Sequence, residues 1–302
     1  MGFTRRSEVE KIFHKIAGNR PFCILIGNCQ IPVIKKILLS SRQFRERYFI
    51  LDVPPIHVIT HKDLARIEKC TFVFRECSLY ITQYIKSDNG FAPFYATENI
   101  RKIANCHSEF IVIPVLYLDL YFPQTGQNRW VNSLLNEVGV LSFAYGDCIL
   151  DELSKKYSIE DIVEIVCMEH LFSDRFLRWM YDTRLEEMQN REARCDVKIY
   201  DYIIENFRKE QLFYSKNHPY KKVFVAFGKR LLDRIGFQDQ AVEQIRMPEL
   251  DEWQEIIYPS VASYYGLCFD KAWYRDPVAD EECELKEIIR LYISTTQGHK
   301  GI

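Results

Sequence analysis

The first half of the chain alternates between short apolar runs and segments with helical spacing, and this alternation constrains the fold more than any other feature. Apolar runs of strand length fall at 22–27, 48–53, 78–85 and 109–118. Segments with apolar residues three or four apart lie between them, at 29–41, 63–74 and 99–106. Strands that alternate with helices form parallel sheets that are covered on both faces. The pattern therefore predicts a doubly wound α/β domain over roughly residues 20–150.

The second half of the chain is rich in helix formers. From 147 to about 207 the chain is rich in helix formers and charge, and the segment 159–207 has apolar residues at helical spacing and few breakers, which predicts two or three long helices. A further helix is expected from about Tyr220 to Ile235, with Pro219 at its first position, and another in the C-terminal stretch ECELKEIIRLYIS. We therefore expect a single domain over 1–302. Its parts are an α/β core at about 20–150 and 211–240, a helical insertion at about 147–207 and a C-terminal helical segment at 241–302.

Composition narrows the possible function classes. Lys and Arg number 40 against 42 Asp and Glu, for a net charge of -2, and nucleic-acid binders usually show a basic excess. No apolar run reaches the roughly 18 residues of a membrane span, and the N-terminus lacks the apolar core of a signal peptide. The ten cysteines form no CxxC pair, and His57 and His61 lie in a segment that reads as a loop. We expect a cytoplasmic protein without nucleic-acid or metal binding.

The first apolar run ends in the motif Gly-Asn-Cys-Gln at 27–30. In open α/β sheets the carboxyl ends of the strands carry the binding sites. A helix that begins there presents unpaired N–H groups and a partial positive charge, which lower the pKa of a nearby cysteine. Gly27 permits close approach to the backbone, and Asn28 and Gln30 place amide side chains beside Cys29. Cys29 is therefore a candidate nucleophile, and the alternative is a small residue that fills a tight turn.

The second candidate is His218, in the motif Asn217-His218-Pro219. It lies between an apolar strand-like run and a new helix, so it is also expected near an edge of the sheet. A cysteine and a histidine from distant parts of a chain form a minimal nucleophile–base pair. The alternative is a histidine with a purely local role in the loop or in capping the helix.

Several motifs in fixed order resemble the WcbI-type capsular polysaccharide biosynthesis proteins. They are GNCQ after the first strand, TQYI with Gln83, YFPQ at 121–124, the late His-Pro and IYPSVASYYGL. The similarity runs from about residue 22 to about 265. It implies a parallel Rossmann-like sheet similar to that of the SGNH/GDSL esterases and acyltransferases, with a large additional helical part.

The resemblance also implies a chemistry. The family is associated with coenzyme A and with O-acetylation of capsular sugars, so the expected partners are acetyl-CoA as a substrate and a sugar or polysaccharide precursor. Cys29 takes the place of the nucleophilic serine of SGNH enzymes and His218 that of the catalytic histidine, while Gln30 and Gln83 line the same pocket. We expect O-acetyl transfer, by way of an acyl-enzyme on Cys29 or directly with His218 as general base.

Coenzyme A brings phosphates, which bind cations and helix N-termini. The candidate cations are Lys216, Lys221 and Lys222 around His218, and Arg129 after the fourth apolar run. Gly27 and Asn28 are the candidates for backbone and amide contacts with the cofactor. The alternative for each of these four cations is a solvated surface charge, and for any single one that alternative is favoured.

One departure from the SGNH pattern keeps other functions open. Those enzymes carry an aspartate three residues before the histidine, and this chain has Ser215 there. A thiol needs less activation than a hydroxyl, since its own pKa is near ~8.5. The alternatives are an SGNH-like esterase or hydrolase, and a non-catalytic coenzyme A- or carbohydrate-binding protein. The long helices at 147–207 can form a lid or the interface of a homo-oligomer.

Overall fold

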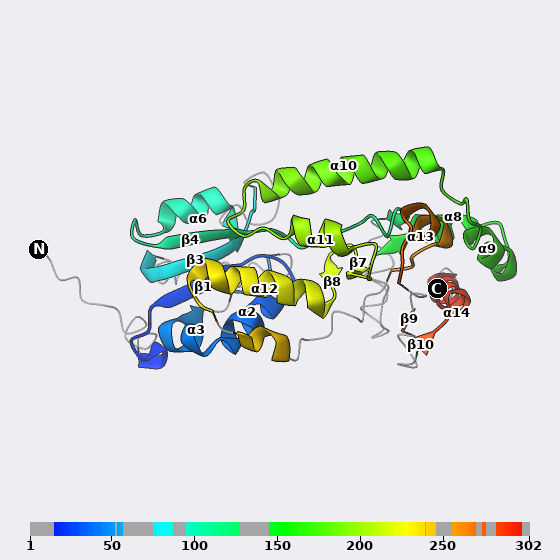
Figure 1. The fold of residues 1–302 in the computed structure, drawn as a ribbon. Coiled ribbons are helices and arrows are strands. Elements are labelled where there is room, and N and C mark those ends of the chain that lie inside the picture. Colours follow the sequence, from blue (N-terminus) through cyan, green and yellow to red (C-terminus); the bar gives the residue numbers. More distant parts are fainter. Residues whose placement is uncertain are drawn as a thin grey trace, which may run out of the picture. The chain divides into compact units, whose positions relative to one another are not determined.

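The computed structural model describes residues 15–51, 53–56, 75–86, 95–126, 145–238, 240–245, 255–269, 274–275 and 282–297 (Figure 1). The chain divides into two compact units. The first comprises Met1–Val115, Asn190–Ile199 and Phe224–Met247. The second comprises Leu116–Gln189, Tyr200–Val223 and Pro248–Ile302. Whether they make up one domain, with the predicted core and insertion, stays a prediction.

The first unit contains a four-stranded parallel sheet. Its strands are β1 (Phe22–Ile26), β2 (Phe49–Leu51), β3 (Cys77–Gln83) and β4 (Glu109–Ile113), in the order β2-β1-β3-β4. All three pairings are parallel. Each strand falls on one of the four apolar runs in the sequence, so the prediction of a parallel α/β sheet is confirmed.

Both faces of the sheet are covered at its centre. All five residues of β1 are buried, and so are six of the seven in β3. A strand with water on one face would alternate between buried and exposed side chains, whereas a strand covered on both faces is apolar throughout. One face packs Phe22, Ile24 and Tyr80 into a single apolar cluster. This cover explains why the strands read as continuous apolar runs.

Short helices follow the strands of the first unit. They are α2 (Ile31–Ser40), α3 (Arg42–Arg47) and α6 (Thr97–Ile103), together with most of α12 (Lys221–Ile235) and the 3₁₀ helix η2 (Gln240–Gln244). Pro32 lies in the first turn of α2, where a missing N–H costs nothing. Ser41 then caps α3 by accepting a hydrogen bond from the N–H of Phe44 at 3.1 Å. The predicted helix at 63–74 lies outside the described residues.

The second unit is mainly helical. Its helices are α8 (Cys148–Leu153), α9 (Ile159–Val166), most of α10 (Asp174–Glu192), α11 (Tyr200–Asn206), α13 (Pro259–Tyr265) and α14 (Leu285–Gln297). Three two-stranded pairs accompany them: β5 (Thr125–Gly126) with β6 (Gly146–Asp147), β7 (Phe213–Ser215) with β8 (His218–Pro219), and β9 (Tyr274–Arg275) with β10 (Glu282–Cys283).

Two details of the predicted helices are wrong. The stretch 159–207 forms three helices, which agrees with the predicted number, but only α10, with 19 residues, is long. Asp147 and Ser158 cap α8 and α9 through their side-chain oxygens. Pro219 does not begin α12. It pairs with Phe213 in a hairpin, and α12 starts at Lys221.

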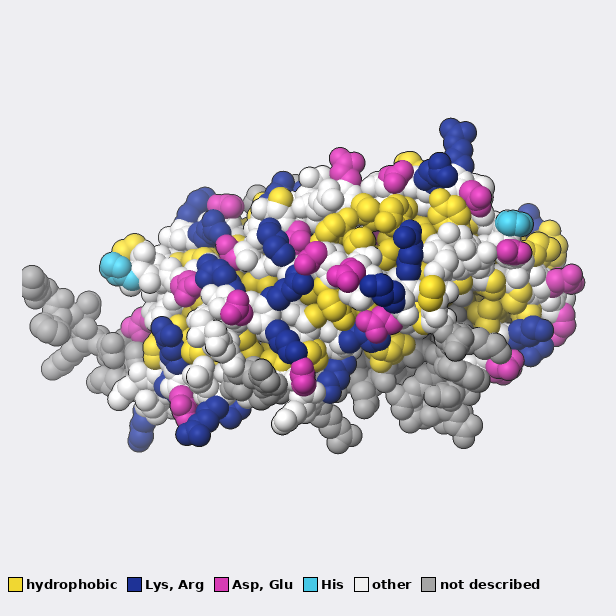
Figure 2. Space-filling model, viewed as in Figure 1, with side chains coloured by type: hydrophobic (Ala, Val, Ile, Leu, Met, Phe, Trp, Pro, Cys, Tyr) yellow, Lys and Arg dark blue, Asp and Glu magenta, His cyan; other side chains and the backbone are white. Residues whose placement is uncertain are grey.

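The visible surface carries mixed charges. Figure 2 shows Lys and Arg side chains interspersed with Asp and Glu side chains. This mixture follows from the nearly equal numbers of cations and anions in the sequence. Among the described residues, no helix has the length and apolar character needed to cross a bilayer. The cytoplasmic location stays a prediction.

Candidate functional site

The motif Gly27–Gln30 connects β1 to α2 at the point where the order of the sheet reverses. The next strand along the chain, β2, pairs with one edge of β1, and β3 pairs with the opposite edge of β1. Ligands of open α/β sheets bind outside the carboxyl ends of the strands at such a reversal. Gln83 is the last residue of β3, and it therefore lies at the same end of the sheet as Cys29.

The side chain of Gln83 holds the turn after β1 in place. Its Oε1 accepts a hydrogen bond from the N–H of Asn28 at 2.8 Å, and its Nε2 donates to Oε1 of Gln30 at 3.1 Å. Gln83 and Gln30 are both buried. A Cβ at position 27 would lie 2.4 Å from Oε1 of Gln83, so the turn requires glycine there. The sequence prediction placed these residues together, and within the first unit they are together.

The environment of Cys29 differs from the predicted one. Burial raises the pKa of its thiol, and the hydrogen bond from its own backbone N–H opposes this only in part. Helix α2 begins at Ile31 with Gln30 as its N-cap, so Cys29 precedes the first turn. The expected net lowering of the pKa of Cys29 is therefore wrong, because burial outweighs the groups at the start of the helix.

His218 lies in the second unit, at the start of β8. It is buried, and its hairpin partner is Ser215, the position at which the predicted SGNH pattern would have an aspartate. Lys216 and Asn217 form the two-residue connection between β7 and β8. Cys29 and His218 belong to different units, and their pairing as nucleophile and base stays a prediction.

The four candidate phosphate ligands have different surroundings. Lys216 is half-buried and its Nζ lies 3.8 Å from the centre of the Tyr145 ring. Burial lowers the pKa of Lys216, against the opposing charges of Glu255 and Asp119. Lys221 is exposed at the start of α12. The other two offer less support, because Lys222 pairs with Glu210 at 2.6 Å and Arg129 lies outside the described residues.

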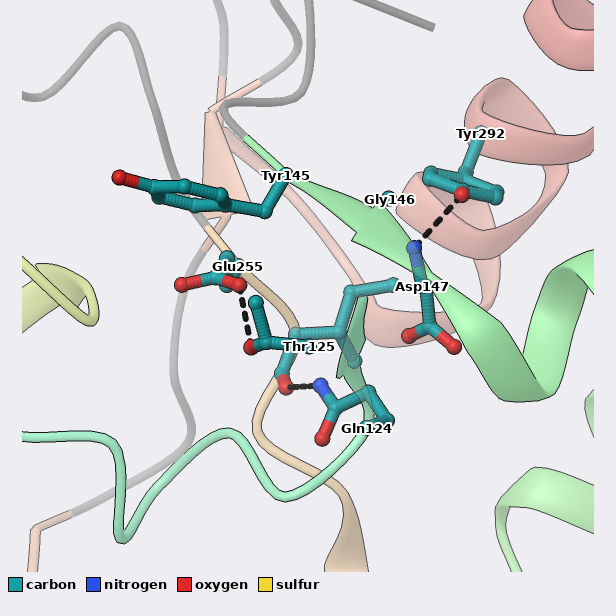
Figure 3. Close-up of a pocket in the computed structure, with 8 residues that line it drawn as sticks. Gln124, Thr125, Tyr145, Gly146, Asp147, Glu255 and Tyr292 are labelled. Atoms are coloured by element: carbon teal, nitrogen blue, oxygen red, sulfur yellow. Dashed lines mark hydrogen bonds between the residues drawn. The ribbon is translucent and has the colours of Figure 1, made fainter. Parts of the chain in front are cut away.

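Two buried carboxyl groups that the sequence interpretation missed lie in the wall of one small cavity (Figure 3). They belong to Glu255 and Asp147, both in the second unit, and the cavity of about 10 Å³ is close to the smallest that holds a water molecule. Burial raises the pKa of Glu255 to about 7, with hydrogen bonds from Thr125 and Lys216 opposing it. Burial also raises the pKa of Asp147 to about 7.

The sequence offered a partial signal for these two groups. Asp147 precedes a helix at N-cap spacing, which predicts a capping role, and its Oδ1 accepts from the N–H groups of Ile149 and Leu150. Glu255 precedes the apolar pair Ile256 and Ile257 in a stretch with three other acidic residues, so nothing local distinguishes it. Within the described residues, no group of three or more His, Cys, Asp or Glu side chains is arranged to hold a metal ion.

Comparison with known proteins decides the family. A family model described as "Polysaccharide biosynthesis enzyme WcbI" matches residues 22–240. The chain belongs to this family. A search of curated proteins gave no match.

A solved WcbI structure has the same fold. The aligned region covers 92% of this chain and 90% of the WcbI chain, with a TM-score of 0.70 and 15% sequence identity. That protein is described as a novel polysaccharide biosynthesis enzyme, in its native form without a disulfide bond between coenzyme A and one of its cysteines. The similarity to an SGNH core stays a prediction.

The raised pKa of Glu255 predicts a pH-dependent stability. The folded protein keeps this proton up to about pH 7, whereas the pKa in an unfolded chain is 4.5. Because the folded state binds more protons between these values, the contribution of Glu255 to stability falls as the pH rises through them. Relative to Glu255→Gln, the wild-type free energy of unfolding should fall by about 3 kcal/mol from pH 4.5 to pH 8. Urea unfolding of both proteins measures this difference, and a pH-independent difference would contradict it.

The raised pKa of Cys29 predicts slow alkylation in the unliganded protein. Because the thiolate is the reactive form, iodoacetamide should modify Cys29 more slowly at pH 7 than it modifies Cys106, which is exposed. The rate at Cys29 should still increase above pH 9. Peptide mass spectrometry over a time course reports both rates in one sample. Faster modification of Cys29 than of Cys106 at pH 7 would show that the turn stabilises a thiolate.

Proposed function

We propose that the protein transfers an acyl group, with acetyl as the simplest case, from acyl-CoA to a sugar hydroxyl during polysaccharide biosynthesis. The observation that carries this proposal is the position of Cys29. Its thiol belongs to a turn built by Gln83 at the reversal point of a parallel sheet, where ligands of such sheets bind. Family membership supplies the polysaccharide context.

The proposed reaction proceeds in two steps. Sγ of Cys29 attacks the thioester carbonyl, the acyl group passes to the sulfur, and the coenzyme A sulfur leaves and takes up a proton. The sugar hydroxyl then attacks the acyl-cysteine, gives its proton to a base and releases the thiol. His218 is the candidate base. Since burial favours the neutral thiol, the first step also needs a base near Cys29.

The oxyanion of each step needs donors that are already in place. The N–H of Gln30 donates to Oδ1 of Asn28 at 3.0 Å, and Nε2 of Gln83 donates to Gln30. The backbone N–H of Cys29 interacts with its own sulfur. When that sulfur forms the new C–S bond, this N–H is the donor beside the reacting carbon. The backbone N–H of Cys29 is therefore the proposed oxyanion donor, ahead of the N–H of Gln30 and the side-chain amide of Gln83.

Coenzyme A is proposed as the acyl carrier because the description of the similar solved structure names coenzyme A, as a molecule to which one of its cysteines is not disulfide-bonded in that form. Lys216 and Lys221 are the proposed phosphate contacts from this chain. Lys216 is suited to the task because half-burial and the Tyr145 ring limit its motion. Four further contacts with coenzyme A remain predictions: those of Lys222, Arg129, Gly27 and Asn28. A homo-oligomeric assembly also remains a prediction.

Calorimetric titration of coenzyme A and acetyl-CoA tests the proposal. Wild type and Cys29→Ala should both bind with micromolar affinity, but only wild type should transfer the acetyl group to an oligosaccharide acceptor. Cys106→Ala, at an exposed cysteine, is the matched control and should do both. Absence of binding to either ligand would overturn the proposal. Acetyl-CoA cleavage that no acceptor accelerates would indicate a hydrolase instead. Binding of coenzyme A without any reaction would indicate a non-catalytic binding protein.

A further inference from the structure

The hairpin that carries His218 has a two-residue loop, and the residues of this loop are not the types that favour a tight hairpin turn. Two-residue hairpin loops favour turn types with a positive φ at one or both loop positions, which is why Asn-Gly and Gly-containing pairs dominate them. Here the loop is Lys216–Asn217, and neither residue has a positive φ. The pairing is also irregular between Phe213 and Ser215. Contacts with other segments must therefore hold this loop.

Three such contacts reach the loop within the second unit. The N–H of Leu118 donates to the carbonyl oxygen of Lys216 at 2.8 Å. The hydroxyl of Tyr145 donates to Oδ1 of Asn217, also at 2.8 Å. The carboxylate of Glu255 accepts from the N–H of Lys216 through its Oε2, at 2.8 Å. The backbone of Lys216, two residues before His218, is thus bound at both its N–H and its carbonyl oxygen.

Glu255 is the least expected of these anchors. It is 6% exposed, and burying a carboxylate is costly unless strong hydrogen bonds compensate. Its Oε1 accepts from the hydroxyl of Thr125 at 2.5 Å, and its backbone N–H donates to the carbonyl of Tyr214 at 2.7 Å. Figure 3 shows the carboxylate between Thr125 and Tyr145. One residue therefore links β5, β7 and the loop before His218.

We propose that Glu255 is a positioning residue that fixes the Lys216–Asn217 loop and, through it, the orientation of the His218 imidazole. This inference deepens the proposed function, because it concerns the base of the proposed reaction. Glu255 acts through its acceptor atom on the N–H of Lys216. An amide oxygen in the same place can do the same, while the NH₂ group of a glutamine can donate to the Thr125 oxygen.

The charged and titratable groups around Glu255 come from several elements. Lys216, on the loop itself, favours the ionised carboxylate, and Asp147, at the end of β6, opposes it. Tyr145 and Tyr292 complete the titratable lining of the same cavity. Asp147 offers a matched comparison, because it is equally buried but bonds to Tyr258 and to the start of α8 instead of the loop.

The direct test is NMR of the protein labelled with ¹³C-histidine. The chain has seven histidines, and the signal of His218 is assigned by its loss in His218→Gln. Glu255→Ala should shift or broaden the His218 signal. Glu255→Gln and Asp147→Asn should leave it in place. If Glu255→Ala does not fold, Glu255→Asp is the substitute, because the shorter side chain withdraws the acceptor from Lys216. An unchanged His218 signal in folded Glu255→Ala or Glu255→Asp would overturn the inference.

Kinetics add a second readout. Glu255→Ala should lower kcat by on the order of 10- to 100-fold with little change in KM for the acyl donor, and Glu255→Gln should restore most of the rate. An equal loss of rate in Glu255→Gln would overturn the positioning role, since that variant keeps the acceptor. If wild type transfers no acyl group, the proposed function fails, while the histidine spectra still decide the role of Glu255.

Discussion

The hydrogen bonds made by the buried side chain of Gln83 support the rest of the candidate site. One amide ties the end of β3 to two residues of the turn after β1, and so joins the two strands at the reversal point of the sheet. Asn28 and Gln30 are thereby fixed on either side of Cys29. A neutral amide suits this position, because it offers a donor and an acceptor without the cost of burying a charge. The glycine before Asn28 is the other half of the constraint, since any side chain there would collide with Gln83.

The sequence predicted the sheet because its signal is local and strong. Continuous apolar runs such as FCILI have few alternatives to a strand covered on both faces, and the helical segments between them fix the parallel arrangement. The resemblance to the WcbI-type proteins grouped Gln83 with Cys29, and the parallel sheet explains that grouping, since parallel strands bring their carboxyl ends to one edge. Helix lengths in 159–207 were harder to predict, because capping side chains such as Ser173, whose hydroxyl accepts from the N–H of Phe176, interrupt a pattern with continuous helical spacing.

What the sequence could not supply depends on burial and on distant contacts. The net shift in the pKa of Cys29 depends on how far the thiol is from water, and burial reverses the lowering that its place before α2 predicts. Glu255 acquires its role only by meeting Lys216, 39 residues earlier in the chain. The same burial that makes its carboxylate a firm anchor also raises its pKa towards neutrality.

The central claim is that Cys29 receives the acyl group, and rapid mixing with acetyl-CoA followed by acid quench and intact-mass measurement tests it most directly. We expect a mass increase of one acetyl group, located by peptide mapping on Cys29 and absent from Cys29→Ala. The acetyl group should disappear when an acceptor sugar is added. Acetyl transfer to the sugar by Cys29→Ala at the wild-type rate, with no acetylated intermediate in the wild type, would contradict the claim and indicate direct transfer with His218 as the base.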